Sequence, residues 1–533
     1  FVQGAARQVV WRQPSQGEDV AVRVMPSVVD VGLQNGSKPD IALADRSSVY
    51  SEMGTGTRTP PRRSDSVGPQ GNQVASGTVA AVFLPESNAT PLSALPAAEP
   101  PASPPSRLEQ IRRSWALQKN LRGLWDRPGG ALGCLDGVRA LAVLWVVAYH
   151  SFTIWGGFLG NTGPPGFIPL RQSWMAQIIL SGELGVDMFF VLSGFLIALQ
   201  GVREMRRTNK LNYFGFLWAR WWRICPTYIA SILANVIFNI QNSRVCCGKS
   251  WWANLLFINN LQGHDIGFED GVPNSICMLW TWSIALEFQF YFLTPGILML
   301  CCNRDGSARP TAFPLLIFFI FCFLAIRAGI FFGLSPDGKT VPEQMTNVVW
   351  TRGHTYLMGV GACIAYNEKL GREPSTLFAL FDVLAYPLGL LMAFLGNGAE
   401  QYRMVWDLPE FVAKFQIIFS QGLFALAVSW GCFRCVSDRA PLLNSFLSAK
   451  FWVPFARLSY AAYLMQFCAI NPLFSHWKIF FKGTPMIDGL FLWIDFYVVT
   501  VVLVFLIALI HHLLFEAPSL NMRKAVTPKC LER

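Results

Sequence analysis

The chain has 533 residues, of which 52% are hydrophobic and only 14% are charged. A soluble globular protein carries about 25% charged residues, so the composition excludes that class and indicates a protein embedded in a membrane. The formal net charge is +10, but the Lys and Arg residues lie in short segments between apolar blocks, which is typical of membrane orientation signals. We expect no nucleic-acid partner.

The first part of the chain does not have the pattern of a membrane domain. Residues 1–106 are rich in Pro, Ser, Ala and Gly and show no sustained apolar period, which predicts a disordered N-terminal tail. Residues 107–130 interleave Arg and Lys with Trp, Leu and Ile. This mixture predicts an amphipathic, basic pre-membrane segment on the membrane surface.

Apolar blocks of about 20 residues, the length that a spanning helix needs, occupy the rest of the chain. They predict an all-α fold, a polytopic transmembrane helical bundle of about ten spans over residues 131–520, followed by a C-terminal tail at 521–533. The patch at 251–261 is too short to cross and is expected to be re-entrant or interfacial. The ten blocks lie near 138–156, 184–201, 224–241, 279–301, 312–333, 350–366, 377–396, 413–433, 451–470 and 489–514.

The distribution of basic residues predicts the orientation of these spans. Six basic residues flank the second and third spans, whereas the preceding loop, 157–183, contains only Arg171. The basic loop is therefore expected in the cytosol, and alternation of ten spans places the N- and C-termini there too. Which membrane holds the protein stays open. The six residues are Arg203, Arg206, Arg207, Lys210, Arg220 and Arg223.

Most of the thirteen cysteines lie in apolar segments, where Cys packs as a small hydrophobic residue. Cys246, Cys247 and Cys277 fall in one predicted non-cytosolic loop, so two of them can form a disulfide if that side is oxidising. The CxxC pair Cys432–Cys435 has no second pair at metal-site spacing, which favours packing. We expect no metal site.

The first span carries two ionisable residues, Arg139 and His150. Their spacing of eleven residues brings them within about 20° on one helix face and about 16 Å apart along it, so the two can line one path. Ionisable groups inside a span are candidate functional residues. The alternatives are an interfacial anchor for Arg139 and an interhelical hydrogen bond for His150, and helix geometry alone favours these alternatives.

The fourth span places Ser283, Glu287 and Tyr291 on one helix face by their spacing of four. Glu287 is expected at a depth comparable with that of His150. A carboxylate that holds one imidazole nitrogen fixes the tautomer and raises the basicity of the other nitrogen. The pattern therefore predicts His150 and Glu287 as catalytic residues that meet, with a structural ion pair as the alternative.

Six motifs in a consistent order resemble the acyltransferase-3 family of integral membrane O-acyltransferases, and ten spans agree with that family. The resemblance covers residues 135–518 and not the N-terminal tail. One position departs from it, because members often have a His where this chain has Gln466. The motifs are Leu135–Ala142 with His150 at Arg-x10-His spacing, Gly185–Ile197, Arg220–Pro226, Trp282–Tyr291, Leu458–Leu464 and Phe515–Pro518.

The resemblance implies transfer of an acyl group, commonly acetyl, from cytosolic acyl-CoA to a hydroxyl of a glycan or lipid at the opposite face. Acyl-CoA is thus expected as a donor substrate, with no permanently bound cofactor. We hypothesise that Arg139, Arg220 and Arg223 bind the CoA phosphates, because guanidinium groups match phosphate oxygens. His150 is then a general base or a transient acyl acceptor, and Glu287 orients it.

Ser193 and Tyr291 are the other predicted substrate contacts. The Ser193–Gly194 step favours close helix packing, although Ser193 can instead face the substrate path. No GxSxG motif surrounds Ser193, which argues against a nucleophile. The rival function is a non-enzymatic transporter of lipid or small molecules, because buried Arg, His and Glu residues also build proton relays. The sequence does not identify the acceptor.

Overall fold

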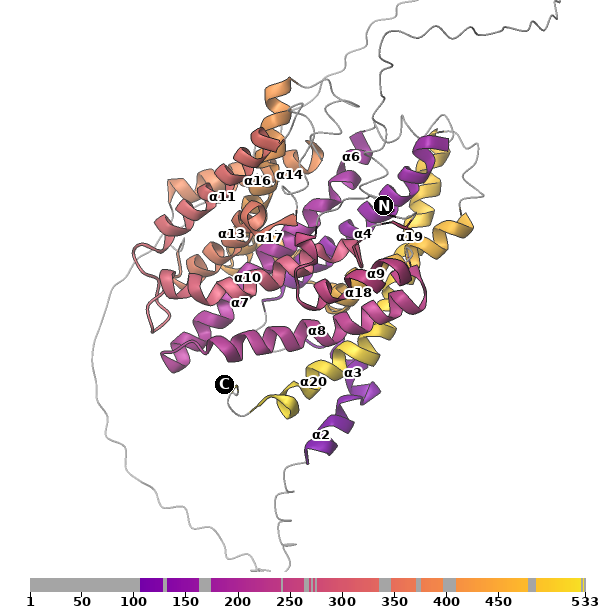
Figure 1. Ribbon diagram of the computed structural model, residues 1–533. Coiled ribbons are helices and arrows are strands. Elements are labelled where there is room, and N and C mark those ends of the chain that lie inside the picture. The colour runs from indigo at the N-terminus through magenta and orange to yellow at the C-terminus, as the bar shows by residue number, and fades with distance from the viewer. Residues whose placement is uncertain are drawn as a thin grey trace, which may run out of the picture. The chain divides into compact units, whose positions relative to one another are not determined.

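The computed structural model describes residues 106–127, 132–162, 174–240, 243–262, 268–269, 272–273, 276–334, 347–370, 375–395, 409–477, 486–528 and 531. The predicted disordered tail, 1–106, lies outside these residues except for Ser106. The described chain is almost wholly helical, which confirms the predicted all-α class (Figure 1).

Each predicted apolar block corresponds to a long helix in the described part of the chain (Figure 1). The helices form because apolar side chains face lipid or one another while the backbone satisfies its own hydrogen bonds. They are α4 (Cys134–Thr162), α7 (Leu184–Thr208), α8 (Tyr213–Ile237), α10 (Trp282–Cys301), α11 (Ala312–Leu334), α13 (Val349–Asn367), α14 (Thr376–Leu395), α16 (Glu410–Val436), α18 (Trp452–Trp477) and α19 (Met486–His511).

Seven helices among the described residues are long and apolar enough to cross a membrane. The protein is therefore a multi-pass membrane protein, but the predicted count of about ten spans is not confirmed. The three helices α8, α13 and α18 fall short because polar side chains interrupt their apolar faces. Arg220 on α8, Arg352 on α13 and Gln466 on α18 are examples, and all three are buried.

Short elements connect the long helices and cover their ends. Figure 1 shows α8 running across the view beneath α9 and α10, with α20 on its other side. The short elements are α2 (Arg107–Ser114), α3 (Leu117–Gly123), α6 (Trp174–Leu180), η1 (Ser181–Glu183), α9 (Ser243–Leu255), η3 (Asn259–Leu261), η4 (Leu279–Thr281), α17 (Pro441–Leu447), the π-helix η5 (His512–Glu516), α20 (Ala517–Val526) and a minimal hairpin, β1 (Phe268–Glu269) with β2 (Val272–Pro273).

The predicted pre-membrane segment contains the helices α2 and α3. α2 packs against α20, and the Trp115 indole donates a hydrogen bond to the backbone oxygen of Leu514 (3.3 Å). Leu108 and Trp125 remain exposed. Exposed apolar side chains beside exposed arginines fit an amphipathic helix, and its place on the membrane surface stays a prediction.

A disulfide and a buried amide hold the start of α10 in place. Of the three cysteines considered above, Cys247 and Cys277 form the disulfide, which joins α9 to the segment before η4. The Asn254 amide donates hydrogen bonds to the Tyr228 hydroxyl (2.7 Å) and to the backbone oxygen of Cys277 (2.9 Å). The short patch at 251–261 thus forms the end of α9 and η3, and it anchors the helix that carries Glu287.

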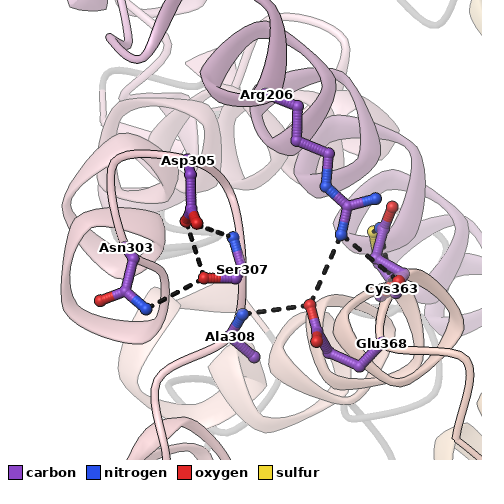
Figure 2. Close-up of polar contacts among 8 residues, drawn as sticks. Arg206, Asn303, Asp305, Ser307, Ala308, Cys363 and Glu368 are labelled. Atoms are coloured by element: carbon purple, nitrogen blue, oxygen red, sulfur yellow. Dashed lines mark hydrogen bonds and ion pairs between the residues drawn. The ribbon is translucent and has the colours of Figure 1, made fainter.

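The ends of α7 and α13 are joined by polar contacts, which Figure 2 shows. The Arg206 guanidinium lies 3.3 Å from the backbone oxygen of Asn367 and 3.5 Å from the Glu368 carboxylate. That carboxylate also accepts a hydrogen bond from the backbone N–H of Ala308 (3.1 Å), in the loop between α10 and α11. Three helix ends are therefore tied together on the basic side of the bundle.

The helices α7 and α13 approach closely because glycines face the partner backbone. A Cβ atom on Gly194 would lie 2.2 Å from the backbone oxygen of Tyr356, and one on Gly359 would lie 2.1 Å from that of Val191. Such close approach is typical of helix pairs in membranes. Gly194 therefore performs the packing predicted for the Ser193–Gly194 step.

We expect Gly359→Ala to destabilise the protein by about 1–3 kcal/mol, because the new methyl group would push α13 away from α7. Thermal unfolding of the purified protein would measure the loss. Gly329→Ala on α11 is the matched control, since a Cβ atom there meets nothing within 4 Å. Equal stability of the two variants would contradict the close approach.

Candidate active site

Four helices, α7, α8, α10 and α18, surround a cavity of about 1020 Å³, including its open mouth, and α4 contributes one residue to it. The lining includes all of the predicted site residues except His150. The structure therefore brings together six predicted site residues from α4, α7, α8 and α10 in one cavity. They are Arg139, Ser193, Arg220, Arg223, Glu287 and Tyr291.

The cavity is long in the direction of α7. Its lining residues on that helix run from Val186 to Gln200, about 21 Å at 1.5 Å per residue. The hydrocarbon core of a bilayer is about 30 Å thick. The lining thus runs along a length of α7 that is about two thirds of that thickness.

Four guanidinium groups line the cavity, from Arg139, Arg220, Arg223 and Arg457. Arg220 is buried, donates a hydrogen bond to the side-chain oxygen of Gln200 and lies 5.9 Å from the ring centre of Tyr291. Guanidinium groups bind phosphate and carboxylate oxygens through paired hydrogen bonds. The cavity is therefore suited to an anionic ligand.

Two carboxylates accompany these arginines, Glu287 and Glu516. Glu516 belongs to the π-helix η5, and one of its carboxylate oxygens lies 2.8 Å from His512 Nδ1. π-Helical turns inside α-helices occur frequently at functional sites. Here the turn carries Glu516, which lies in the cavity wall.

Glu287 belongs to a polar cluster in the cavity wall. Its Oε1 atom accepts hydrogen bonds from Ser193 Oγ (2.8 Å) and from the Tyr291 hydroxyl. Ser193 Oγ also lies 3.2 Å from the Tyr291 hydroxyl oxygen. Ser193 thus faces the cavity, the second of the two orientations considered for it, and the cluster joins α7 to α10.

His150 lies against α18, and the structure corrects its expected position. Its Nδ1 atom is 3.0 Å from Gln466 Oε1, and its ring centre lies 5.3 Å from that of Tyr149 and 5.0 Å from that of Phe467. In the part of the chain that the structure describes, the residues that line the cavity do not include His150, and no hydrogen bond joins His150 to Glu287. The two residues do not meet because Glu287 bonds across to α7, whereas His150 faces α18.

One residue of α18 connects His150 to the cavity wall. The Gln466 amide donates a hydrogen bond to the backbone oxygen of Tyr463 (3.0 Å), and Tyr463 lines the cavity. The Tyr463 hydroxyl lies 2.7 Å from Ser283 Oγ, which also lines the cavity. A hydrogen-bonded path through α18 therefore connects His150 to a residue of the cavity wall.

Several lining residues were not predicted from the sequence: Gln200, Arg457, Tyr460, Tyr463 and Glu516. The two tyrosines and Glu516 lie in motifs that were recognised, but the motifs did not show which side chains face inward. Gln200 lies two helical turns after Ser193, so the cavity-facing period of α7 could have indicated it. Arg457 had no clear signal.

A second buried ionic cluster was missed. Arg352 on α13 contacts both oxygens of Asp187 on α7 (2.7 and 2.9 Å) and Glu183 in η1 (2.8 Å), and its guanidinium lies 5.6 Å from the Trp282 ring centre. Arg352 lies inside the apolar block 350–366. A charged residue inside such a block indicates that a partner of opposite charge is buried beside it.

No group of three or more potential metal-ligating side chains occurs among the described residues. The structure instead defines an integral membrane protein with an arginine-lined internal cavity and a polar cluster in its wall. Residues 132–513 match the acyltransferase domain family. The chain therefore belongs to the acyltransferase-3 family.

The chain is similar to curated proteins from a nematode and from bacteria. The chain is 24% identical over 376 residues to "Nose resistant to fluoxetine protein 6" of Caenorhabditis elegans, covering 63% of this chain and 44% of that protein. It is 30% identical over 177 residues to the peptidoglycan O-acetyltransferase OatA of Listeria monocytogenes, covering 31% of this chain and 24% of that protein. A similar match, 27% identity over 186 residues, covers 32% of this chain and 25% of the Staphylococcus aureus O-acetyltransferase OatA.

The chain thus spans less than half the length of each of these relatives. No solved structure gives a significant match.

Proposed function

We propose that this protein transfers an acyl group, with acetyl as the first candidate, from acyl-CoA to a hydroxyl of a glycan or lipid. One observation carries the proposal: the arginine-lined cavity extends along α7 past the cluster of Ser193, Glu287 and Tyr291. Membership of the acyltransferase-3 family supports the reaction type, and the O-acetyltransferase relatives support a hydroxyl acceptor.

The donor is proposed to enter from the cytosol, the side to which the basic loops assign the arginines. Arg139, Arg220 and Arg223 then bind the CoA phosphates, and the pantetheine arm follows α7 into the bundle. Ser193 and Tyr291 contact the arm near the thioester. The acceptor hydroxyl arrives from the opposite face, so that the membrane domain carries the acyl group across.

The chemistry needs a base for the hydroxyl proton, and His150 is the proposed one. The hydroxyl oxygen forms a bond to the acyl carbon while the C–S bond of the thioester breaks, and the proton passes to His150 and then to the CoA thiolate. If His150 instead accepts the acyl group transiently, the same bonds exchange in two steps. Because His150 does not line the cavity, either route requires a rearrangement that brings the acyl carbon and the His150 ring together.

Purified protein in lipid nanodiscs, incubated with acetyl-CoA labelled in the acetyl group, provides the test. Loss of label from CoA to a glycan or lipid acceptor, or capture of label on the protein, supports the acyltransferase. A protein that leaves the label on CoA with every acceptor offered contradicts it and favours the transporter alternative.

Arg223→Ala is expected to raise the KM for acetyl-CoA about 10- to 100-fold, because a hydrogen bond to a charged group contributes about 1.5–3 kcal/mol. The kcat should change little, since phosphate contacts lie far from the thioester. Initial rates over a range of acetyl-CoA concentrations measure both constants. Arg112→Ala on α2, outside the cavity lining, is the matched control; an equal KM for the two variants would remove Arg223 from donor binding.

A further inference from the structure

The side chain of Gln466 on α18 is fully buried. Both the nitrogen and the oxygen of its amide form hydrogen bonds. Its Nε2 atom donates to the backbone oxygen of Tyr463 (3.0 Å), and its Oε1 atom lies 3.0 Å from His150 Nδ1. A backbone carbonyl oxygen can only accept hydrogen bonds. The amide must therefore present its NH₂ group to Tyr463 and its oxygen to His150.

This orientation decides the protonation of the imidazole ring. An amide oxygen is an acceptor only, so the facing Nδ1 atom must carry the hydrogen. In a neutral imidazole the other nitrogen, Nε2, then has the free electron pair. We propose that Gln466 is a positioning residue, which holds His150 in the Nδ1–H tautomer with Nε2 available as the base for acyl transfer.

The other contacts of the His150 ring do not fix its tautomer. Among the described residues, no charged side chain acts on the His150 ring, and Tyr149 is the titratable group beside it. On the α18 side the ring contacts Phe467, which in turn packs on Trp280 with ring centres 4.3 Å apart. The role that a carboxylate usually plays for a catalytic histidine thus falls to a neutral amide.

A neutral amide and a carboxylate act differently on a histidine ring. A carboxylate would stabilise the imidazolium and favour the charged form, whereas Gln466 fixes the tautomer without adding charge to the buried site. The inference rests on the proposed function for its role in the reaction, but the tautomer itself can be measured without any activity.

The first experiment is nitrogen-15 NMR of the full chain labelled only at histidine. The chain contains six histidines, and the difference between wild type and His150→Ala identifies the His150 signals. We expect wild-type His150 in the Nδ1–H form, and Gln466→Leu to shift it towards a mixture of tautomers. An Nε2–H form in the wild type, or no change in Gln466→Leu, overturns the proposal.

The second experiment uses the rate of acyl transfer. Gln466→Leu should lower kcat about 10- to 100-fold, the range found when a group that orients a metal-ligating histidine is removed, with an unchanged KM for acetyl-CoA. Gln466→Glu keeps an acceptor atom for the Nδ1–H group, so its kcat should lie clearly above that of Gln466→Leu. Gln421→Leu, a buried glutamine on α16 outside the cavity lining, controls for general damage to the fold.

The two experiments separate the possible failures. The Nδ1–H tautomer in a protein that transfers no acyl group would refute the proposed function and leave the structural role of Gln466 intact. Normal kcat in Gln466→Leu, in an active enzyme, would refute the positioning role. A loss of rate that Gln466→Glu does not recover would assign the effect to packing and also overturn it.

Discussion

Replacing His150 by alanine is expected to lower the rate of acyl transfer by about 10²–10⁴-fold, the range that a general acid–base group supplies. Binding of acetyl-CoA should be retained, because the arginines that line the cavity are untouched. Single-turnover rates and equilibrium binding of acetyl-CoA, measured on the same preparation, separate the two effects. The loss should be similar whether His150 acts as base or as acyl acceptor.

Capture of label on the protein distinguishes these two routes. An acyl-histidine intermediate would carry the label in the wild type and not in His150→Ala, whereas a general base would leave the protein unlabelled. His476→Ala is the matched control, because His476 is exposed near the end of α18.

A normal rate in His150→Ala would remove His150 from the chemistry. The reaction would then have to use groups that line the cavity, where Ser193 Oγ donates to Glu287. Glu287→Gln tests that case, because it removes the negative charge and keeps an oxygen for the Tyr291 and Ser193 hydroxyls.

Replacing Arg352 by methionine is expected to destabilise the protein by about 3–5 kcal/mol, because it leaves buried carboxylates without their partner. Arg352 and Asp187 side chains are both 0% exposed and Glu183 is 13% exposed. The change also removes a buried polar contact between α7 and α13. Thermal unfolding in detergent, at a fixed lipid content, measures the loss.

The double variant Arg352→Met/Asp187→Leu should recover part of the stability, because a buried pair can often be replaced by apolar side chains of similar size. Arg206→Met provides the control, since its pairing with Glu368 is partly exposed and such pairs contribute about 0–1 kcal/mol. If Arg352→Met and Arg206→Met lowered the unfolding temperature equally, the buried cluster would not be a major source of stability.

The long helices and the family could be predicted from the sequence because both depend on local patterns. An apolar block of about 20 residues forms a helix in lipid whatever its neighbours, since the backbone must satisfy its hydrogen bonds within the segment. Every predicted block has its helix in the described chain. The motifs likewise needed only their residues and order, and six of the seven predicted site residues line the cavity.

The number of spans was harder to predict, because the more polar helices turn their polar residues towards the protein interior. α8, α13 and α18 present Arg220, Arg352 and Gln466 to the protein interior. Average hydropathy does not show whether such a side chain is buried. It therefore could not tell a membrane-crossing helix from one held by its neighbours.

The partners of the ionisable groups were decided by tertiary structure alone. Helical spacing states which residues share a face, but the rotation of each helix and the identity of its neighbour follow from packing, as at Gly194 and Gly359 between α7 and α13. The sequence therefore identified His150 and Glu287 as unusual residues and predicted a comparable depth for them. Packing placed His150 beside Gln466 and Glu287 beside Ser193, because each side chain bonds to the helix that lies against its own face.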